Sequence, residues 1–295
     1  MFGDLVNGSS MALIPSPVVT MTSMIVPYCS YIPPPAAMMK RRLILAIAAA
    51  LAATALAVCS AGAQAACDLN AAGTGKVTAV RDGRTLMLDD GRELRLAAIE
   101  ITGNSHDALQ ALAAGRMLRL ERLGAGKTLE QDRYGRLVAF AFADGGEQSL
   151  QQALLEQGFA RVATRVGAKA CAEVLLTTER AARAAGRGLW ADPNFAPLQV
   201  ENLARLTAQR GHFALVEGKV LSVRESGATI YVNFGRRWTR DFTVTILKRQ
   251  QRIFAAAGLE PKQLEGRRIR VRGWIEQRGG PIIAAEAPEQ IEFAD

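Results

Sequence analysis

Hydrophobic and polar residues alternate along the chain from about residue 76, as they do in half-buried β-strands. Two Asp-Gly pairs interrupt the alternation, and this dipeptide between alternating segments is a strong signal for a tight turn. We therefore expect an antiparallel three-stranded unit. Its strands are predicted at 76–80, 85–88 and 93–97, with turns at Asp82-Gly83 and Asp90-Gly91.

A helical period follows this β-rich start. Apolar residues recur every three or four positions in three segments, and glycine follows the last two segments, as it often does at helix ends. We predict helices at 107–118, 149–157 and 170–185, and a further strand at 137–142.

A second β-rich region, 213–295, begins after a proline-containing segment that we expect to be a linker at 193–212. It contains five short strand-like segments, with one helical segment between the third and the fourth. That order is typical of an OB barrel, a fold that often binds oligonucleotides. The predicted strands are 213–223, 229–233, 242–246, 268–274 and 282–285, and the predicted helix is 247–257.

The first 65 residues have a different character. Residues 38–65 contain a basic stretch, an apolar run and an end rich in small residues, which is the order of a secretory signal peptide. A single membrane anchor is the alternative, but the apolar run is shorter than the ~20 residues that a span requires. Residues 1–37 show no apolar periodicity, and we interpret them as a disordered stretch that results from a start codon assigned too early. We expect a periplasmic or secreted protein with no stable membrane insertion after cleavage.

The charge and the cysteine content of the exported protein exclude residues 1–65, which we call the leader. The whole chain carries 36 Lys and Arg against 28 Asp and Glu, and loss of Lys40, Arg41, Arg42 and Asp4 lowers the net charge from +8 to +6. A basic chain favours a polyanionic partner, either nucleic acid or an anionic membrane surface. With only two histidines, a His-rich zinc site is not expected.

Two of the four cysteines, Cys67 and Cys171, lie outside the leader. An even pair in an exported chain is typical of a disulfide, because such bonds form and persist in oxidising compartments. Two free buried thiols are the alternative.

Four segments of the first region carry a family resemblance. In this order and spacing they resemble the thermonuclease (staphylococcal nuclease-like) family, over about residues 75–190. The segments are VTAVRDGRTLMLDDGRELRLAAIE (77–100), DRYGRLVAFAFADG (132–145), LLEQGFARV (154–162) and AARAAGRGLW (181–190).

The resemblance implies a fold and an activity for this region. The fold is a five-stranded OB barrel with three helices, and the activity is calcium-dependent cleavage of DNA and RNA phosphodiester bonds. Residues 214–246 and 264–276 resemble a C-terminal extension of some exported bacterial members. The fold class that we predict is therefore mainly β with helices (α+β), with two tandem OB-fold-type β-barrels at 66–192 and 213–295.

The resemblance also assigns residues to the site. Arg95 and Arg136 match the two arginines that clamp the phosphate, and Tyr134 matches the tyrosine beside the second arginine. Arginine suits this role because its planar fork offers two hydrogen bonds to one phosphate. Asp82 and Glu100 match acidic residues of the calcium site.

Other residues of the family's site are altered. Arg84 stands where the family has a ligand aspartate, and Gly103 stands where it has the glutamate that handles the attacking water. The family's nucleotide-contacting tyrosines fall on Thr164 and Val166. Calcium prefers several carboxylate or carbonyl oxygens, which a guanidinium cannot replace. We therefore expect binding of DNA or RNA phosphates, with Arg84 as a further contact, and little or no cleavage.

Two other functions stay open at this point. One is an active calcium-dependent nuclease whose metal site has shifted to Asp82, Glu100 or Asp132; the other is a non-catalytic envelope protein-interaction module. Each site arginine also has a simpler interpretation, because an arginine beside an acidic residue is commonly a solvated ion pair worth at most ~1 kcal/mol.

The second region offers its own candidate contacts. Strand periodicity places Arg268, Arg270 and Arg272 on one face of the strand predicted at 268–274. Arginine combined with aromatic residues is typical of surfaces that follow a nucleic-acid backbone and stack its bases. Alternatively, these arginines only keep the barrel surface wet, while Trp238 and Trp274 fill its core.

Overall fold

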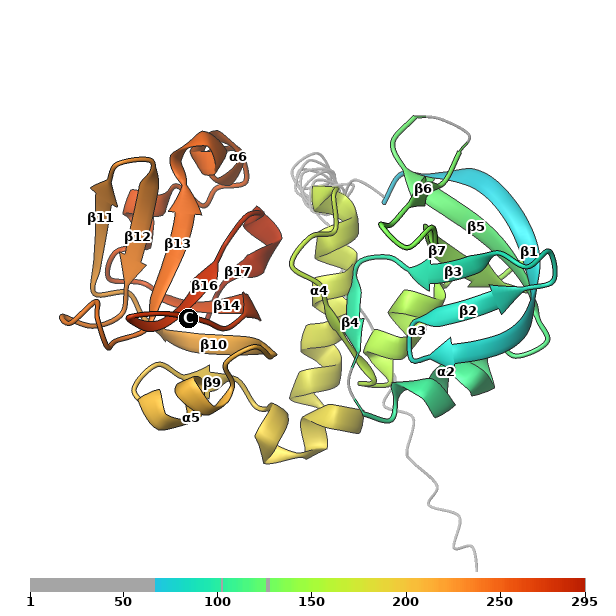
Figure 1. Ribbon diagram of the computed structural model, residues 1–295, viewed down its shortest axis with the longest axis horizontal. Coiled ribbons are helices and arrows are strands. Elements are labelled where there is room, and N and C mark those ends of the chain that lie inside the picture. The colour runs from blue at the N-terminus through green and yellow to red at the C-terminus, as the bar shows by residue number, and fades with distance from the viewer. Residues whose placement is uncertain (1–66, 102, 126–127, 295) are drawn as a thin grey trace, which may run out of the picture. The chain divides into compact units, whose positions relative to one another are not determined.

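The computed structural model describes residues 67–101, 103–125 and 128–294 (Figure 1). These residues belong to one compact unit of the chain. The predictions for 1–37 and for a signal peptide at 38–65 lie outside the described residues.

Five strands of the first half close into a barrel (Figure 1). Their order is β3-β2-β1-β5-β7, and a parallel ladder between β3 and β7 completes the ring. The two-residue strand β6 (Glu130–Gln131) pairs with β7 outside this ring. The barrel strands are β1 (Leu69–Asp82), β2 (Thr85–Leu88), β3 (Glu93–Leu96), β5 (Met117–Leu123) and β7 (Leu137–Ala143). The mixed α+β class with a closed five-stranded barrel is thus confirmed.

The length of β1 lets it pair with two different neighbours. Residues 69–76 pair with β5, and residues 77–82 pair with β2. Gly75 lies next to this change of partner, and a Cβ atom there would lie only 2.9 Å from Leu88 Cδ1. Register shifts in both ladders accompany the bend, as expected where a barrel strand curves.

Three helices and a short β-ladder complete this part of the chain (Figure 1). Their apolar faces join the barrel interior in one buried cluster. Ser149 caps the second helix by accepting a hydrogen bond from the Gln152 backbone N–H. The helices are α2 (Ser105–Ala113), α3 (Leu150–Glu156) and α4 (Lys169–Ala184), and the ladder joins β4 (Ile99–Ile101) to β8 (Ala160–Val162).

The first predicted helix was too long. Residues 107–118 were expected to be helical, but α2 ends at Ala113 and β5 begins at Met117. Gly115 adopts a left-handed conformation with φ of 73°, which stops the helix. Leu118 and Leu120 then point into the barrel core.

A disulfide joins Cys67 to Cys171, with the two Cα atoms 4.4 Å apart. It fastens the chain just before β1 to the first turn of α4, across a sequence separation of 104 residues. The predicted pairing is confirmed.

The segment expected to be a linker has structure of its own. It contains a short strand that pairs with the second β-region, and a helix that packs Leu206 into the same core. Leu198 and Val200 are also buried there. The 3-10 helix η2 (Gly188–Ala191) precedes this segment, whose own elements are the 3-10 helix η3 (Pro193–Phe195), the strand β9 (Leu198–Gln199) and the helix α5 (Leu203–Ala208).

The second β-region forms two sheets around a separate core cluster. The first sheet has the order β17-β14-β10-β9, and the second has the order β11-β12-β13-β16-β15. The first contains β10 (Phe213–Lys219), β14 (Arg268–Trp274) and β17 (Ile291–Phe293), besides β9. The second contains β11 (Ser222–Ser226), β12 (Thr229–Asn233), β13 (Thr243–Leu247), β15 (Glu276–Arg278) and β16 (Gly280–Ala284).

One predicted strand, 213–223, is split between the two sheets. Val220 N donates to Arg267 O at 2.9 Å on the β14 side, whereas Leu221 N donates to Asn233 O at 2.8 Å on the β12 side. The chain therefore passes from one sheet to the other within two residues. The predicted helix at 247–257 consists of a 3-10 turn, η4 (Lys248–Gln250), followed by α6 (Gln251–Ala256). Two further 3-10 turns are η5 (Pro261–Leu264) and η6 (Pro288–Gln290).

Candidate phosphate-binding site

Arg95 and Arg136 meet beside one carboxylate, that of Asp132. Arg95 lies in β3 and Arg136 directly precedes β7, so the ladder that closes the barrel brings them together. Arg136 donates to Asp132 Oδ2 from Nε at 2.8 Å and from Nη2 at 2.7 Å. Arg95 Nη1 lies 3.8 Å from the same oxygen, which is a looser contact. The structure thus clusters the two predicted phosphate clamps.

Asp132 also orders the turn that carries the second clamp. Its Oδ1 accepts hydrogen bonds from the backbone N–H groups of Tyr134 and Arg136, at 2.9 and 3.1 Å. Gly135 takes the left-handed conformation that this turn needs, with φ of 79°. The hydrogen bond from Arg136 lowers the pKa of Asp132 to about 2, so this carboxylate stays ionised at neutral pH.

Tyr134 presents its ring to solvent beside the clamps. Its exposed fraction is 66%, and the guanidinium carbons of Arg133 and Arg136 lie 4.8 and 5.2 Å from the ring centre. An exposed aromatic ring beside two cations can stack a base while the cations attract its phosphate.

Arg84 pairs with the residue expected to bind calcium. Its Nη1 donates to Glu100 Oε2 at 2.6 Å and to the Ile99 carbonyl oxygen at 3.2 Å. The turn at 82–84 sets this position: Asp82 Oδ1 accepts from Arg84 N at 2.8 Å. Gly83 is required there, because a Cβ atom would lie 2.3 Å from Ser105 Cβ.

Charges of both signs surround Arg95 in this part of the barrel. Burial lowers the pKa of Arg95, and the charges of Arg84 and Arg136 lower it further, while Glu100 and Asp132 act in the opposite direction. The lowered pKa of Arg95 is thus due first to burial and second to the neighbouring guanidinium groups.

The residues at the positions of the family's metal site do not fit a calcium ion. Glu100 is engaged by a guanidinium, and Asp82 holds a backbone N–H. No group of three or more His, Cys, Asp or Glu residues suited to a metal occurs in the described ranges. Because calcium needs several oxygen ligands around it, we derive no chemistry through a metal at this site.

Comparison with known proteins identifies the first barrel. Residues 103–192 match the family model described as staphylococcal nuclease homologue. This domain belongs to that family. It is a family of nuclease type that binds nucleic acids. No curated protein matches the chain significantly.

The site of the nuclease-like domain extends beyond the matched residues. Asp132, Tyr134 and Arg136 lie inside the match, whereas Arg84 and Arg95 precede it. The ladders of β3 with β7 and of β4 with β8 join these two parts into one structure.

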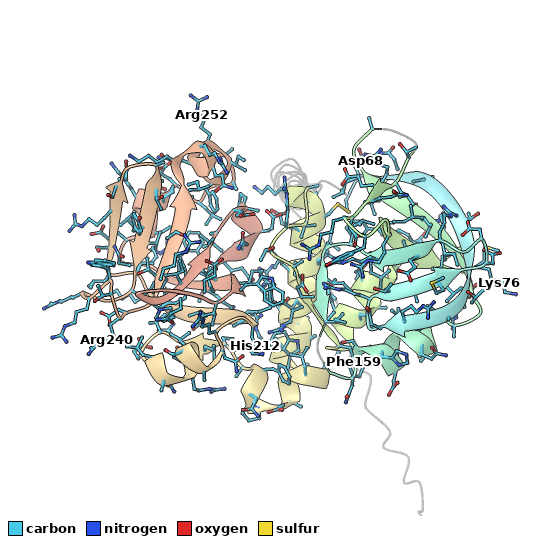
Figure 2. All side chains as sticks on the ribbon, in the orientation of Figure 1. Asp68, Lys76, Phe159, His212, Arg240 and Arg252 are labelled. Carbon is cyan, nitrogen blue, oxygen red and sulfur yellow. A yellow bond between two sulfur atoms is a disulfide. The ribbon has the colours of Figure 1, made fainter. Side chains whose placement is uncertain are left out.

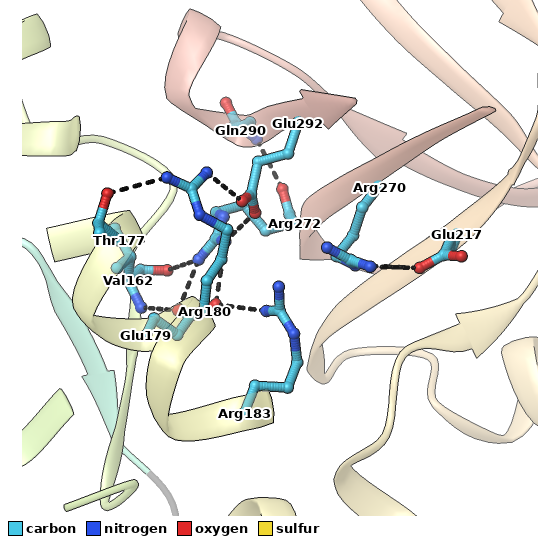
Figure 3. Close-up of polar contacts among 10 residues, drawn as sticks. All are labelled: Val162, Thr177, Glu179, Arg180, Arg183, Glu217, Arg270, Arg272, Gln290 and Glu292. Carbon is cyan, nitrogen blue, oxygen red and sulfur yellow. Dashed lines mark hydrogen bonds and ion pairs between the residues drawn. The ribbon is translucent and has the colours of Figure 1, made fainter. Parts of the chain in front are cut away.

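The arginine face of β14 does not form the open surface that the alternation suggested. Ile269 and Val271 are buried on the opposite face, as predicted. Arg272, however, is only 1% exposed, and its guanidinium donates to both carboxylate oxygens of Glu179 in α4, at 2.8 and 3.0 Å (Figure 3). It also pairs with Glu292 of β17. The prediction that Arg272 contacts nucleic acid is wrong, because α4 covers this side chain.

The other two arginines of this strand pair with a neighbouring carboxylate. Arg270 Nη2 lies 2.6 Å and Arg268 Nε lies 2.9 Å from the two oxygens of Glu217 in β10. Glu217 thus supplies one negative charge for these two guanidinium groups, and their proposed contact with nucleic acid stays a prediction.

The two tryptophans of this region are not core residues. Trp238 is 69% exposed and Trp274 is 49% exposed. Trp238 lies in the β12–β13 connection together with the exposed Arg236, Arg237 and Arg240, and Arg240 projects away from the barrel (Figure 2). The alternative in which the two tryptophans fill the core is thus wrong.

Proposed function

We propose that the nuclease-like domain binds nucleic-acid phosphates through Arg95 and Arg136 without a metal ion, and that it does not hydrolyse them. The observation that carries this proposal is the ion pair between Arg84 and Glu100. A guanidinium already compensates the carboxylate that a metal would need, while the two phosphate clamps are still side by side.

The cluster of Arg95, Arg136 and Tyr134 suits a phosphodiester ligand. Arg95 makes only a 3.8 Å contact with Asp132, so its hydrogen-bond donors can turn to a phosphate oxygen at small cost. Arg136 is held by two hydrogen bonds to Asp132, which fixes its position before the ligand arrives. Tyr134 would then stack a base next to the bound phosphate.

The lack of a catalytic general base at position 103 supports binding without hydrolysis. The glutamate that handles the attacking water in the resembled family corresponds to Gly103, which has no side chain. Loss of an electrostatic or general-base group commonly costs orders of magnitude in rate.

We further propose that the protein works outside the cytoplasm. The disulfide between Cys67 and Cys171 supports this location, because such bonds persist in oxidising compartments. None of the helices in the described part of the chain is long and apolar enough to cross a membrane.

Binding of a fluorescently labelled single-stranded oligonucleotide in chelator tests the proposal. The double variant Arg95→Ala/Arg136→Ala should weaken binding on the order of 100-fold, from about 1.5 kcal/mol for each charge-assisted contact. It should also reduce the slope of log affinity against log salt by about 1.4, because two phosphate contacts are lost.

The matched control is Arg224→Ala/Arg249→Ala, which removes the same charge from exposed positions of the second β-region. Equal affinity of the two double variants would show that only net charge matters and would refute the site. Calcium-dependent cleavage of the oligonucleotide by the unmodified chain would instead support an active nuclease.

A further inference from the structure

A cavity of about 380 Å³ lies beside the barrel site, where β4 and β8 meet β10. Its wall is shared with the phosphate-binding site, because Glu100 lines the cavity and also pairs with Arg84. The other lining residues that matter here are Arg161, Asn194, His212, Phe213 and Trp274.

Arg161 is a buried cation that has no carboxylate partner among the described residues. Only 8% of the residue is exposed, and burial lowers the pKa of its guanidinium to about 10. Its Nη1 donates to the Phe213 carbonyl oxygen at 2.8 Å, and its Nε has no hydrogen-bond partner among the described residues. Burying a charge is costly unless it is paired, so this guanidinium would gain from an anion in the cavity.

The nearest acidic side chains are already engaged elsewhere. Glu100 is opposite Arg161 in the β4–β8 ladder, but its carboxylate binds Arg84 at 2.6 Å. Glu179 accepts hydrogen bonds from Arg272, from Arg183 and from the backbone of Val162. Among the described residues, no carboxylate is therefore paired directly with Arg161, although the charges of Glu179 and Glu100 act to raise its pKa.

An aromatic wall faces the same space. Trp274 and Phe213 are ladder partners at the ends of β14 and β10, and their ring centres lie 6.0 Å apart in an edge-to-face arrangement. Phe213 is buried, and the Arg161 guanidinium lies 4.8 Å from its ring centre. Trp274 is half exposed, so its indole remains available to stack on a planar ligand.

We propose that this cavity binds a nucleotide, with the phosphate at the Arg161 guanidinium and the base stacked on Trp274. Charge selects the phosphate, because the guanidinium has donors without an internal partner. The aromatic wall selects the base, with the amide of Asn194 and the imidazole of His212 as polar neighbours. The inference extends the proposed function to a second subsite, and it can hold even where that function fails.

Calorimetric titration of the unmodified chain with adenosine 5′-monophosphate tests this directly. Trp274→Ala should weaken the nucleotide roughly 5- to 150-fold, the range expected for one stacked base, and should leave binding of ribose 5-phosphate unchanged. Trp238→Ala is the matched control, because Trp238 is an exposed tryptophan away from the cavity. An equal loss of nucleotide affinity in both tryptophan variants would overturn the proposal that the base stacks on Trp274.

The variant Arg161→Met tests whether the Arg161 guanidinium binds the phosphate of the nucleotide. Replacing an unpaired buried cation by an apolar side chain of similar length should leave the melting temperature unchanged or higher. Nucleotide should raise the melting temperature of the unmodified chain but not that of the variant. Unchanged nucleotide affinity in Arg161→Met, or no binding by the unmodified chain at millimolar nucleotide, would overturn the proposal. If the variant does not fold, Arg161→Lys replaces it and should bind at least 10-fold more weakly, because lysine lacks the planar fork.

The two proposals are separated by the double variant Arg95→Ala/Arg136→Ala. It should lose oligonucleotide affinity but bind the mononucleotide as the unmodified chain does. Binding of oligonucleotides with and without a 5′-phosphate shows whether the phosphate in the cavity belongs to a strand end or to a free nucleotide. In this double variant, tighter binding of the phosphorylated strand than of the unphosphorylated strand assigns the cavity to a strand end, and equal binding of the two strands assigns it to a free nucleotide.

Discussion

Arg84 changes the chemistry of the barrel through a single contact, its 2.6 Å ion pair with Glu100. Both side chains are largely buried, so water screens the pair less than it would screen an exposed one. The pair holds a carboxylate that could otherwise bind a cation, and it adds a positive charge next to Arg95. On the proposed function, this one residue shifts the site from cation binding towards anion binding.

Reversal of this charge should restore metal affinity. In Arg84→Asp, three carboxylates at positions 82, 84 and 100 would lie close together, and their repulsion should lower stability until a cation binds. We expect millimolar calcium to raise the melting temperature of this variant but not that of the unmodified chain.

Arg84→Ala is the control for that experiment, because it frees Glu100 without adding a ligand. A calcium response of similar size in Arg84→Ala would mean that the added carboxylate is not a ligand. No response in Arg84→Asp would mean that positions 82, 84 and 100 do not converge as the structure places them.

The sequence predicted much of the site at this scale. The motifs placed Arg95 and Arg136 correctly as neighbours and marked Arg84 as the altered position. The Arg84–Glu100 pair itself was not predicted, because it depends on where β4 lies relative to the turn at 82–84. Arg161 was missed although it lies within a quoted motif. Its importance comes from burial against Phe213, which is 52 residues away in sequence.

Helix α4 connects parts of the described chain that are far apart in sequence. Its first turn is tied to the start of the chain's folded part by Cys67–Cys171, and its middle carries Glu179, which is fully buried. Glu179 accepts from Arg183 one helical turn later and from Arg272 of β14. The helix thus fills the space over the polar face of β14, where an open surface had been expected.

Removal of the disulfide should loosen this helix. We expect Cys67→Ala/Cys171→Ala to lower the free energy of unfolding by about 2–5 kcal/mol, since the cross-link restricts a long loop in the unfolded chain. Urea unfolding followed by circular dichroism measures the loss, and reduction of the unmodified protein should reproduce it. Equal midpoints for the oxidised and reduced protein would contradict a stabilising role.

Periodicity predicts the faces of an element but not what covers them. The alternation in β14 correctly separated Ile269 and Val271 from the arginines. The arginine face then became an ion-pair surface that is buried at Arg272, because carboxylates from α4, β10 and β17 converge on it. Residues 193–212 show the same limit. Their prolines suggested a linker, yet Leu198 and Leu206 pack into the second core.

At the scale of the whole described chain, a buried ion network joins the nuclease-like domain to the second β-region (Figure 3). Arg272 lies between Glu179 of α4 and Glu292 of β17, and Arg180 of α4 binds the other oxygen of Glu292 at 3.1 Å. Buried pairs of this kind add little net stability, but loss of one partner is costly because the other charge stays buried.

The network should make stability depend on pH. Burial acts to raise the pKa of Glu292, but the charge and hydrogen bond of Arg272 outweigh it, so the pKa lies below its ordinary value. A carboxyl with a lowered folded-state pKa stabilises the protein above its unfolded pKa and loses that contribution as pH falls through the folded value. We therefore expect thermal stability to decline below about pH 4.5.

Glu292→Gln tests the network directly. The variant should lower the free energy of unfolding by about 3–5 kcal/mol at neutral pH, because it leaves Arg272 with one ion partner fewer. Its stability should also fall less steeply with acid than that of the unmodified chain. Glu276→Gln is a control of the same chemistry in an exposed pair with Arg278. Identical effects of the two substitutions would contradict a special role for the buried network.

The sequence by itself determined the local features of this protein: the strand alternation, the turns, the cysteine pair and the spacing of the clamp motifs. These features follow from short-range sterics, from solvent exposure and from a family pattern that is readable in order along the chain. The tertiary structure decided which charges are compensated. Arg84, Arg161 and Arg272 have the same side chain, yet one pairs at the barrel site, one lacks a carboxylate partner beside a cavity, and one is buried in a network. Those outcomes depend on partners 16, 52 and 93 residues away, and only folding brings them within contact distance.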